Sequence, residues 1–397
     1  MYKKARVIAF YLPQYHPIPE NDMFWGKGFT EWTNVGKAKP LFKGHYQPKV
    51  PADLGYYDLR LPEVREEQVN LAKYAGIEGF CYWHYWFGSG KELLERPFNE
   101  VVNSGHPNFP FCLGWANHTW STKTWSASNS QFKETVIMEQ TYPGEEDYKL
   151  HFNTYLKAFK DSRYIRVDGK LLFVIFSPLS IPNFVEMKRI WNNLAMENGL
   201  KGFYFIGIAE NYTVTNNTTS HSIKKRYTYS SLAKKAESVY NNLFEKGFDA
   251  VNSRGSNRAQ VLSDSPLVYY FKRFMMKVFN LKIIVKYNYK DIINNYYVKE
   301  DKWDNVYPTI IPNFDRSPRA GKNTTNIWYN STPELFRKQI IKAMDLIKDR
   351  DEEHKILFLQ SWNEWGEGNY VEPDLKYGRK FLDVLRELLI CLLYTSP

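Results

Sequence analysis

Short runs of apolar, β-branched and aromatic residues alternate with longer stretches of helical periodicity, and this alternation limits the fold more than any other feature of the sequence. Strand-like runs that each precede a helix are typical of repeated βα units, which place parallel strands in one sheet. Neither a glycine-rich phosphate loop nor its dinucleotide fingerprint follows the first run, as a dinucleotide-binding sheet would require. The pattern therefore predicts an α/β fold, a closed TIM (β/α)8 barrel with its functional residues at the carboxyl ends of the strands. The predicted strands are residues 6–11, 79–85, 109–115, 170–176, 201–209, 248–251, 306–311 and 355–360.

The segments between these runs complete the barrel and add two long interruptions. Residues 12–57 are punctuated by proline and glycine, which predicts an extended loop. Residues 263–302 are basic and aromatic, with helical periodicity in part, and predict an insertion before the seventh strand. We expect a single domain over residues 1–390 and interpret residues 391–397 as a non-native tail. Apolar residues at helical spacing predict helices at 62–75, 91–103, 145–161, 187–199, 333–348 and 381–389.

Composition narrows the classes of function. Aromatic residues make up 17% of the chain, and Trp and Tyr rings near strand ends suit the alternating CH and OH faces of a sugar. The net charge of +10 comes from basic residues scattered along the chain, without an aromatic-basic ribonucleoprotein motif. We therefore expect no nucleic-acid partner, and a weak positive field that favours anionic glycans or peripheral contact with a lipid-linked glycan.

Cysteine usage and hydropathy predict a cytoplasmic protein. Cys81, Cys112 and Cys391 have neither metal nor disulfide spacing, and the first two lie in apolar runs, so buried reduced thiols are expected. The apolar run near the N-terminus is too short for a signal-peptide core, and no stretch reaches the ~20 apolar residues of a membrane span. Neither a metal nor a cofactor is expected.

The densest group of candidate catalytic residues follows the eighth predicted strand. Glu364 and Glu367 stand three positions apart in the run 361–368, flanked by two tryptophans and two glycines. Cleavage of a glycosidic acetal needs one protonated carboxyl as acid and one carboxylate as base or nucleophile, and an apolar aromatic wall can separate two such pKa values. We predict Glu364 and Glu367 as the catalytic pair. The alternative is a pair of glutamates that caps the start of a helix.

Polar and aromatic side chains at the other strand ends are candidates for substrate binding, because all strand ends of a barrel meet on one face. His84 is explained equally well as a buried core histidine, Glu210 as a helix-capping acid, and Asp315 with Arg319 as a local salt bridge. The predicted substrate-binding residues are Tyr11, Gln14, His16, Trp32, Trp83, His84, Trp115, Asn117, His118, Trp120, Glu210, Asp315, Arg319, Trp362, Asn363 and Trp365.

Several motifs resemble a known family. Residues 9–16 read Ala-Phe-Tyr-Leu-Pro-Gln-Tyr-His, and they are followed by Trp25, by Phe-Thr-Glu-Trp at 29–32 and by Tyr-Trp-His-Tyr-Trp at 82–86. The terminal motif, Trp-Asn-Glu-Trp-Gly-Glu-Gly at 362–368, is the most specific. Together these motifs resemble the WbsX family, which is encoded in bacterial polysaccharide-synthesis clusters and is related to glycoside hydrolase family 99. The resemblance extends over roughly residues 5–385.

The resemblance implies a TIM barrel and a mechanism. Endo-acting mannosidases of family 99 have a similar Asn-Glu-Trp-x-Glu-Gly segment with two catalytic glutamates. By position, Glu364 would deprotonate the sugar 2-hydroxyl, which attacks its own anomeric carbon, and Glu367 would be the general acid and then the base for water or an acceptor. This chemistry implies a 2-hydroxyl trans to the leaving group, as in an α-mannoside-like sugar. Gly366 stands where those mannosidases have histidine, so the resemblance does not extend to that contact.

Three functions are compatible with these residues. The first is a glycoside hydrolase or transglycosylase that acts on a bacterial surface polysaccharide of the O-antigen or capsule type. The second is a nucleotide-sugar-dependent glycosyltransferase, the label often given to WbsX proteins. The third is a catalytically silent carbohydrate-binding barrel. The first is preferred, because no nucleotide-sugar signature on a Rossmann-like sheet is visible.

Overall fold

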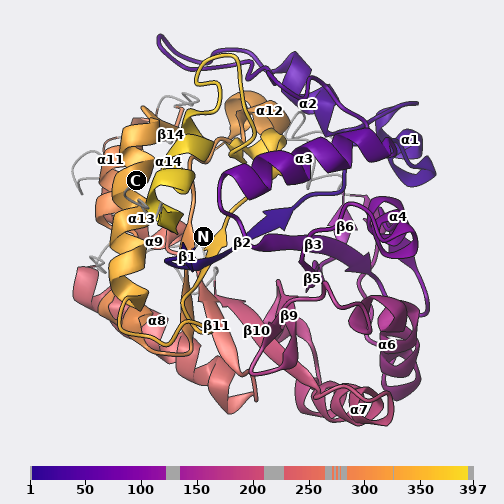
Figure 1. The fold of residues 1–397 in the computed structure, drawn as a ribbon. Helices are drawn as coiled ribbons and strands as arrows, with labels where there is room; N and C mark the ends of the chain where they lie inside the picture. The colour runs from indigo at the N-terminus through magenta and orange to yellow at the C-terminus, as the bar shows by residue number, and fades with distance from the viewer. Residues whose placement is uncertain are drawn as a thin grey trace, which may run out of the picture.

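Parallel strands close into a barrel at the centre of the molecule (Figure 1). The computed structural model describes residues 2–121, 135–209, 228–263, 284–324 and 326–391, with residues 271, 274, 275 and 278. Each barrel strand pairs in parallel with the next one along the chain, and the last pairs with the first, so spatial order follows chain order. The eight strands in the described residues are β2 (Arg6–Tyr11), β3 (Gly79–Trp86), β5 (Phe111–Trp115), β9 (Lys170–Ile175), β10 (Phe203–Ala209), β11 (Ala250–Ser253), β13 (Val306–Ile310) and β15 (Ile356–Leu359).

The predicted TIM barrel is confirmed, with small shifts at the strand ends. The third strand begins at Phe111 rather than at residue 109, and Pro110 before it has no N–H to offer a neighbouring strand. The sixth strand is Ala250–Ser253 rather than 248–251. Phe248 lies ahead of that strand because its ring stacks on Phe184 in the surrounding helical layer, with centroids 3.9 Å apart.

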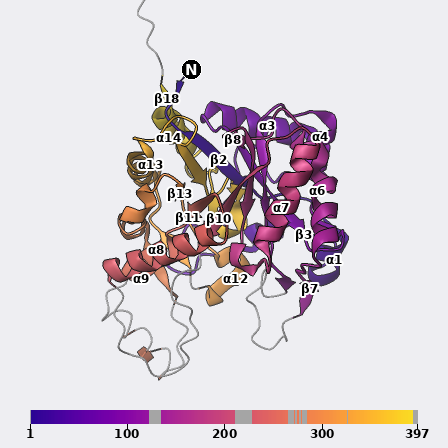
Figure 2. The ribbon, with the colours of Figure 1, turned by 90° about the horizontal axis from the view of Figure 1, so that it is seen from below.

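Helices that connect successive barrel strands surround the barrel (Figures 1 and 2). The helix predicted at 91–103 begins later, at Arg96, because residues 92 and 93 form the short strand β4 (Glu92–Leu93) antiparallel to β3. The surrounding helices are α3 (Pro62–Tyr74), α4 (Arg96–Ser104), α6 (Glu145–Phe159), α7 (Phe184–Glu197), α8 (Tyr229–Glu245), α9 (Ser256–Ser263), α13 (Pro333–Ile347) and α14 (Lys380–Leu389).

The sequence predicted an extended loop at 12–57, and this is wrong in part. The segment contains two short helices, α1 (Pro19–Trp25) and α2 (Glu31–Lys37). Proline in the first turn starts α1, and Thr30 forms a capping box at the start of α2. The described parts of the predicted insertion are β12 (Lys286–Asn288), α11 (Tyr289–Asn294) and η2 (Lys299–Lys302). Tyr289 fixes the insertion to the barrel, because its hydroxyl donates to Ile311 O at 2.7 Å.

The main core lies between the barrel and the helices. Trp191 of α7 is fully buried, with its ring 4.9 Å from Phe173 and 5.0 Å from Phe203, and its Nε1 donates to Tyr148 O at 2.9 Å. Cys81 and Cys112 oppose each other on β3 and β5 as buried free thiols, which confirms the expectation for these two residues.

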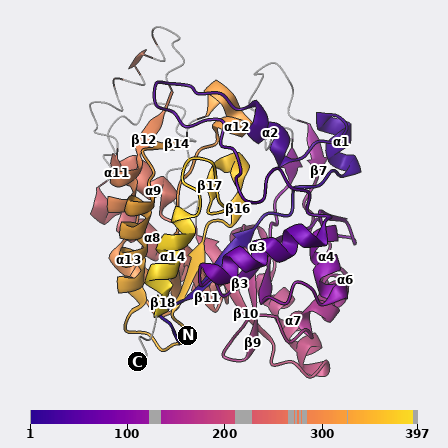
Figure 3. The same cartoon turned by 45° about the horizontal axis from the view of Figure 1, so that its top comes forward.

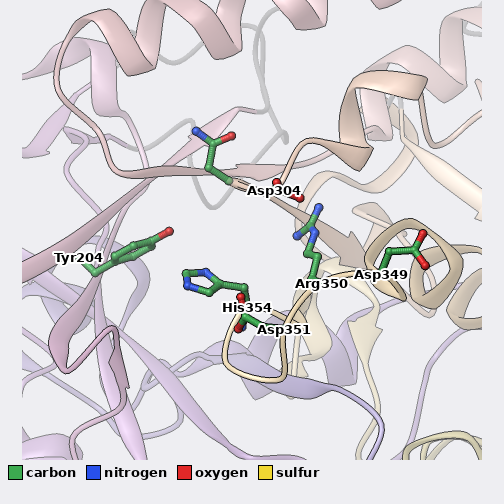
Figure 4. A pocket seen from close by; sticks show the side chains of 7 residues that line it. Tyr204, Asp304, Asp349, Arg350, Asp351 and His354 are labelled. Carbon is green, nitrogen blue, oxygen red and sulfur yellow. The ribbon is translucent and has the colours of Figure 1, made fainter.

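The two ends of the barrel differ. Figure 3 shows α2 and α12 (Ser317–Ala320) at one end and the chain termini at the other. The termini are joined by β1 (Tyr2–Lys3) and β18 (Ile390–Cys391), which pair antiparallel. Near the amino ends of the strands lies a cavity of about 390 Å³, which is drawn in Figure 4. Other short elements are β6 (Trp120–Ser121), β7 (Val136–Met138), β8 (Arg166–Val167), η1 (Pro178–Ser180), η3 (Gly321–Asn323) and β14 (Ile327–Tyr329).

Candidate active site

A tight hairpin after β15 positions both candidate catalytic residues. Strand β16 (Asn363–Glu364) pairs antiparallel with β17 (Asn369–Tyr370), and the 3-10 turn η4 (Trp365–Glu367) connects them. The Asn363 amide attaches this hairpin to the end of β2, because its Oδ1 accepts the Leu12 N–H at 2.8 Å and its Nδ2 donates to Leu12 O at 3.0 Å. Glu364 and Glu367 therefore lie on a turn that is fixed to the carboxyl end of the barrel.

Both carboxylates contact one buried guanidinium. Arg319 of α12 donates from Nη2 to Glu364 Oε1 at 2.5 Å and from Nη1 to Glu367 Oε1 at 2.6 Å. Glu31, the first residue of α2, accepts from Arg319 Nε at 3.0 Å and from Nη2 at 2.9 Å. Arg316 Nε lies 3.2 Å from Glu367 Oε1 as a second cation. Three carboxylates that are far apart in sequence thus converge on Arg319, and the predicted pair of Glu364 and Glu367 is brought together.

The two hairpin carboxylates have different electrostatic surroundings. Burial raises the pKa of Glu364 to about 8, because the opposing effect of Arg319 is offset by the negative charges of Glu367 and Glu31. Burial also acts to raise the pKa of Glu367, but Arg319 and Arg316 outweigh it and hold that pKa below its usual value of 4.5. The opposite directions of the two shifts make Glu364 the carboxylate of the pair that is more readily protonated.

Asp315 supports the Glu367 turn from the neighbouring strand end. Its backbone N–H donates to Glu367 O at 2.6 Å, while its carboxylate accepts hydrogen bonds from His45 Nε2 at 2.8 Å and Gln47 Nε2 at 2.7 Å. Burial would raise the pKa of Asp315, but the His45 hydrogen bond and the nearby Lys49 charge hold it below its usual value. Asp315 and Arg319 form no salt bridge with each other in the described residues.

A second buried arginine lies over aromatic rings at the barrel mouth. Arg254, directly after β11, lies 4.8 Å from the ring centroid of Phe10 and 5.9 Å from that of Trp83. Trp83 stacks on Phe10 with centroids 4.7 Å apart and 4° between the planes. The positive charge of Arg254 contributes to the lowered pKa of Glu367, after the larger effects of burial, Arg319 and Arg316. Trp83 therefore faces the interior of the barrel, beside Arg254 and Phe10.

The charges of the two carboxylates also influence the pKa values of Tyr85 and His118. Burial, followed by the charge of Glu364, raises the pKa of Tyr85. Burial lowers the pKa of His118 to about 4, against the opposing effect of Glu367. His118 is thus a neutral imidazole at pH 7, close enough to Glu367 for electrostatic interaction.

Two other predicted residues, His84 and Trp115, lie between the barrel and α6. His84 Nε2 is 2.8 Å from His151 Nε2, and burial lowers the pKa of His84 to about 3. The Trp115 indole donates to Trp86 O at 2.8 Å, and its ring lies 5.0 Å from that of His151. Both side chains thus occupy the helical layer, as the core alternative for His84 proposed.

Tyr11 and Trp362 also point outward from the barrel. The Tyr11 hydroxyl donates to Gln68 Oε1 of α3 at 2.7 Å, and the Trp362 ring packs 5.3 Å from Phe80. Neither side chain contacts Glu364 or Glu367 through an interaction in the described residues.

Asn117 and Trp120 shape the loops near the mouth. Asn117 Nδ2 donates to Ser177 O at 2.8 Å and to the Tyr142 hydroxyl at 3.0 Å, while the Ser177 N–H donates back to Asn117 Oδ1 at 2.8 Å. Trp120 is fully buried, and its ring packs edge-on against Tyr85 at 4.9 Å. Asn117 therefore joins the loop after β5 to the loop after β9.

Trp32 and Trp365 form an aromatic support behind the hairpin. The Trp32 indole donates to Tyr57 O at 2.7 Å, and its ring lies 5.5 Å from that of Trp365. The Trp365 indole donates to the buried Glu372 at 2.7 Å, and the Tyr57 hydroxyl donates to the same carboxylate at 2.9 Å. Burial raises the pKa of Glu372 to about 7. Glu372 therefore holds the η4 turn in place through its hydrogen bond with the Trp365 indole.

Three further predicted residues remain. Gln14 and His16 are buried in the segment after β2, and Gln14 O accepts the Glu31 N–H at 3.2 Å. Gln14 therefore lies beside the start of α2, next to the residue that binds Arg319. Burial lowers the pKa of His16. Glu210 lies outside the described residues.

Sequence reasoning missed Glu31, Arg254, Arg316 and Glu372. Glu31 lies inside the Phe-Thr-Glu-Trp motif at 29–32, which is a sequence signal for it, although only its neighbour Trp32 is among the predicted residues. Arg254 directly follows the sixth strand, where the strand-end rule could have found it. Nothing in the local sequence marked Glu372 as a buried carboxylate.

In the part of the chain that the structure describes, no group of three or more His, Cys, Asp and Glu side chains is arranged to hold a metal ion. No helix in these described residues is long and apolar enough to cross a bilayer.

The eight parallel strands and the helices around them form a TIM barrel, and solved structures share this fold. A "Glycoside hydrolase-like protein" of known structure matches it with a TM-score of 0.58 at 15% identity, covering 98% of this chain and 95% of that one. A family 99 endo-α-mannosidase from Bacteroides thetaiotaomicron matches with a TM-score of 0.54 at 13% identity, covering 98% and 97%. At these identities the likeness concerns the fold.

The chain belongs to the WbsX family. The family model described as "Glycosyltransferase WbsX" matches residues 7–385. The "Uncharacterized protein WxcX" of two strains of Xanthomonas campestris pv. campestris is 31% identical over 395 residues, which cover 97% of this chain and 50% of each relative. The chain thus spans about half the length of the curated relatives it matches.

Proposed function

We propose that this protein cleaves or transfers a glycosidic bond, with Glu364 and Glu367 as its catalytic carboxylates. The supporting observation is the pair itself, two carboxylates that contact a single guanidinium at the carboxyl end of the barrel and whose pKa values shift in opposite directions. Glycoside cleavage needs one carboxyl that gives a proton to the leaving oxygen and one carboxylate that acts as base or nucleophile. The glycoside-hydrolase-like fold and the position of the pair after the last strand agree with this chemistry.

The proposed substrate is a bacterial surface polysaccharide. The WbsX motifs support this class, and the aromatic mouth around Trp83 offers a ring face for a sugar. Arg254 and Arg316 near Glu367 make the mouth favourable for a glycan with acidic groups, and a lipid-linked glycan is one form of such a substrate.

The two residues divide the work in one of two ways. By family resemblance Glu364 is the base for the 2-hydroxyl and Glu367 the general acid. In the free protein Glu364 instead has the higher pKa of the two, so this assignment requires that substrate binding reverses the order of the two pKa values. In the opposite assignment Glu364, which has the higher pKa in the free protein, is the general acid and Glu367 is the base.

The first prediction tests the pair. Purified protein is incubated with surface polysaccharides, and chain length is followed by size-exclusion chromatography. Glu364→Gln and Glu367→Gln are each expected to lose activity by at least about 100-fold, since acid–base catalysis contributes on this scale. The matched control is Glu197→Gln, because Glu197 is exposed on α7. Activity of both variants at the wild-type level would refute the proposal.

Activated substrates then identify the acid. A glycoside with a good leaving group, such as a dinitrophenyl glycoside, needs little protonation, so the variant that lacks the general acid keeps its bond-cleavage step. The variant that lacks the base stays inactive on the same substrate. If Glu367→Gln is the variant that recovers, the resemblance-based assignment holds. If Glu364→Gln recovers, the reverse assignment holds.

The description of the family model favours a second candidate, a nucleotide-sugar-dependent glycosyltransferase. Calorimetry with a panel of sugar nucleotides separates the two functions, because a hydrolase is not expected to bind them. The spacing Asp349-x-Asp351 occurs beside the cavity near the amino ends of the strands (Figure 4), at the opposite end from the carboxylates. If sugar nucleotides bind, Asp351→Asn tests that cavity and Glu367→Gln tests the barrel mouth.

A further inference from the structure

Glu31 is buried as deeply as any charged residue of the site. Its side chain has no exposed surface, and it binds Arg319 through two parallel hydrogen bonds of 3.0 and 2.9 Å. The Asn34 amide contributes a third contact to Glu31 Oε1 at 3.3 Å. Two-point binding fixes the plane of a guanidinium as well as its position. Glu31 thus determines which way the remaining N–H groups of Arg319 point.

Those remaining N–H groups point to the candidate catalytic pair. Arg319 Nη1 reaches Glu367, and Nη2 divides its donors between Glu31 and Glu364. Glu31 therefore competes directly with Glu364 for the positive charge of Arg319. Without Glu31, the guanidinium would be free to rotate toward either hairpin carboxylate.

The position of Glu31 depends on the glycine in the terminal motif. A Cβ atom placed on Gly366 would lie 1.8 Å from Glu31 Oε1, 2.4 Å from its Cδ and 3.0 Å from Arg319 Nε. These separations are far below van der Waals contact. Gly366 is not among the glycines with positive φ, so space rather than backbone conformation excludes a side chain there. The Glu31 carboxylate fills the volume that any side chain at position 366 would need.

The charges around the pair come from several elements. Three carboxylates face Arg319 and Arg316, so one negative charge more than the nearest cations can balance is present when all are ionised. Burial makes that excess costly, which favours uptake of one proton. The groups that face the pair are Glu31 of α2, Arg316 and Arg319 around α12, Glu364 and Glu367 of the hairpin, Arg254 after β11, Tyr85 of β3, Tyr15 after β2 and His118 after β5.

We infer that Glu31 is a positioning residue, which holds Arg319 between Glu364 and Glu367, and that Gly366 is required because it leaves room for Glu31. This inference rests on the proposed function, since it states how the acid and base roles are maintained. It assigns no contact between Glu31 and the substrate. It predicts that position 31 controls the titration of a residue that lies in another part of the chain.

The test measures the titration of Glu364 directly. Protein labelled with ¹³C at glutamate side-chain carboxyl carbons is titrated by NMR, with Glu364→Gln used to assign the signal. In Glu31→Gln the pKa of Glu364 is expected to fall by about one pH unit or more, because one negative neighbour is removed and Arg319 is released. Glu300→Gln is the matched control, since Glu300 is equally buried but lies near the amino ends of the strands. An unchanged Glu364 titration in folded Glu31→Gln would overturn the inference.

Two more variants guard against misfolding. Glu31→Asp keeps the charge and is expected to keep most of the Glu364 titration, whereas Gly366→Ala is expected to shift it in the same direction as Glu31→Gln. Circular dichroism confirms that each variant is folded. A Gly366→Ala protein that titrates like the wild type would show that Glu31 does not need the space, and would overturn that part of the inference.

The pH–rate profile separates this inference from the proposed function. If Glu364 acts as base, the acid limb of the profile moves to lower pH in Glu31→Gln, and if it acts as acid, the alkaline limb does. A shifted NMR titration with no turnover of any glycan would refute the proposed function and leave the positioning role standing. Normal turnover of a glycan with an unchanged Glu364 titration in Glu31→Gln would support the proposed function and refute the positioning role.

Discussion

Arg319 is buried among three carboxylates, and such an arrangement is stable only while charges of both signs remain together. Its side chain is 7% exposed, and those of Glu31, Glu364 and Glu367 are 0%, 11% and 20% exposed. Removal of one partner from a buried pair leaves an uncompensated charge, which costs more than the pair contributes. The site is therefore sensitive to loss of the cation as well as to loss of the acids.

Substitution of the cation gives a prediction at this scale. Arg319→Met is expected to lower the free energy of unfolding by about 3–5 kcal/mol, as for other broken buried ion pairs. Arg319→Lys keeps the charge, but its single ammonium group cannot reach all three carboxylates. Its free energy of unfolding is therefore expected to lie between those of the wild type and Arg319→Met. Urea unfolding measures both. Arg337→Met is the control, because its partner Glu387 lies on the surface and such pairs contribute about 0–1 kcal/mol. An Arg319→Met midpoint equal to that of the wild type would contradict the prediction.

At the scale of elements, β3 shows how one strand serves two layers. Successive side chains point to opposite faces of a strand. Trp83 faces the mouth of the barrel and stacks on Phe10, whereas His84 faces α6 and contacts His151. The same aromatic run therefore supplies both a wall of the candidate site and part of the core.

The hydrogen bonds of Asn117 to Ser177, which join two loops at the barrel mouth, are expected to contribute to stability. Asn117→Ala removes the amide that joins the loops after β5 and β9, and leaves the Ser177 N–H without that partner. An unpaired group costs about 1–3 kcal/mol when it is fully buried, and the Ser177 N–H is partly buried, so the free energy of unfolding is expected to fall by about 1 kcal/mol. Chemical denaturation checks this. Asn103→Ala at an exposed position is expected to change it by less than about 0.5 kcal/mol. Equal stabilities of the two variants would show that these hydrogen bonds contribute nothing.

At the scale of the whole molecule, buried titratable groups act against one another. Burial lowers the pKa values of His84, His118 and His151, so the unfolded chain binds protons there that the folded chain does not. Burial raises the pKa values of Glu364 and Glu372, where the folded chain binds the extra proton. Acid therefore destabilises the fold through the histidines and stabilises it through these glutamates until they are also protonated in the unfolded chain.

A comparison of variants isolates the contribution of His84. Its pKa falls from 6.5 to about 3 on folding, so its stabilising effect is complete above pH 6.5 and is lost as the pH falls below that value. The free energy of unfolding of the wild type is expected to decline more steeply below pH 6.5 than that of His84→Gln, by about 1.4 kcal/mol per pH unit. Denaturant titrations between pH 7 and 5 measure the slopes. His106→Gln, at an exposed position, should keep the wild-type slope. Identical slopes for His84→Gln and the wild type would contradict the assignment.

Much of the fold could be predicted because it depends on local periodicity. The eight strands are short apolar runs, and most of the surrounding helices repeat apolar residues about every 3.6 positions; a stretch of chain displays both patterns by itself. The short helices α1 and α2 were missed, since proline and glycine in 12–57 hide brief helical turns. The hairpin with Glu364 and Glu367 was predicted as the densest cluster, and the structure places both residues on Arg319.

The sequence by itself determined the barrel, the end of it that holds the candidate site, and the two glutamates of the terminal motif. Only the tertiary structure decided which strand-end side chains face the mouth, because a shift of one residue turns a side chain from one face to the other, as Trp83 and His84 illustrate. It alone also brought Glu31 to Arg319 and into the space beside Gly366. Contacts between distant segments depend on how the loops pack across the mouth of the closed barrel, and no local pattern of residues encodes that packing.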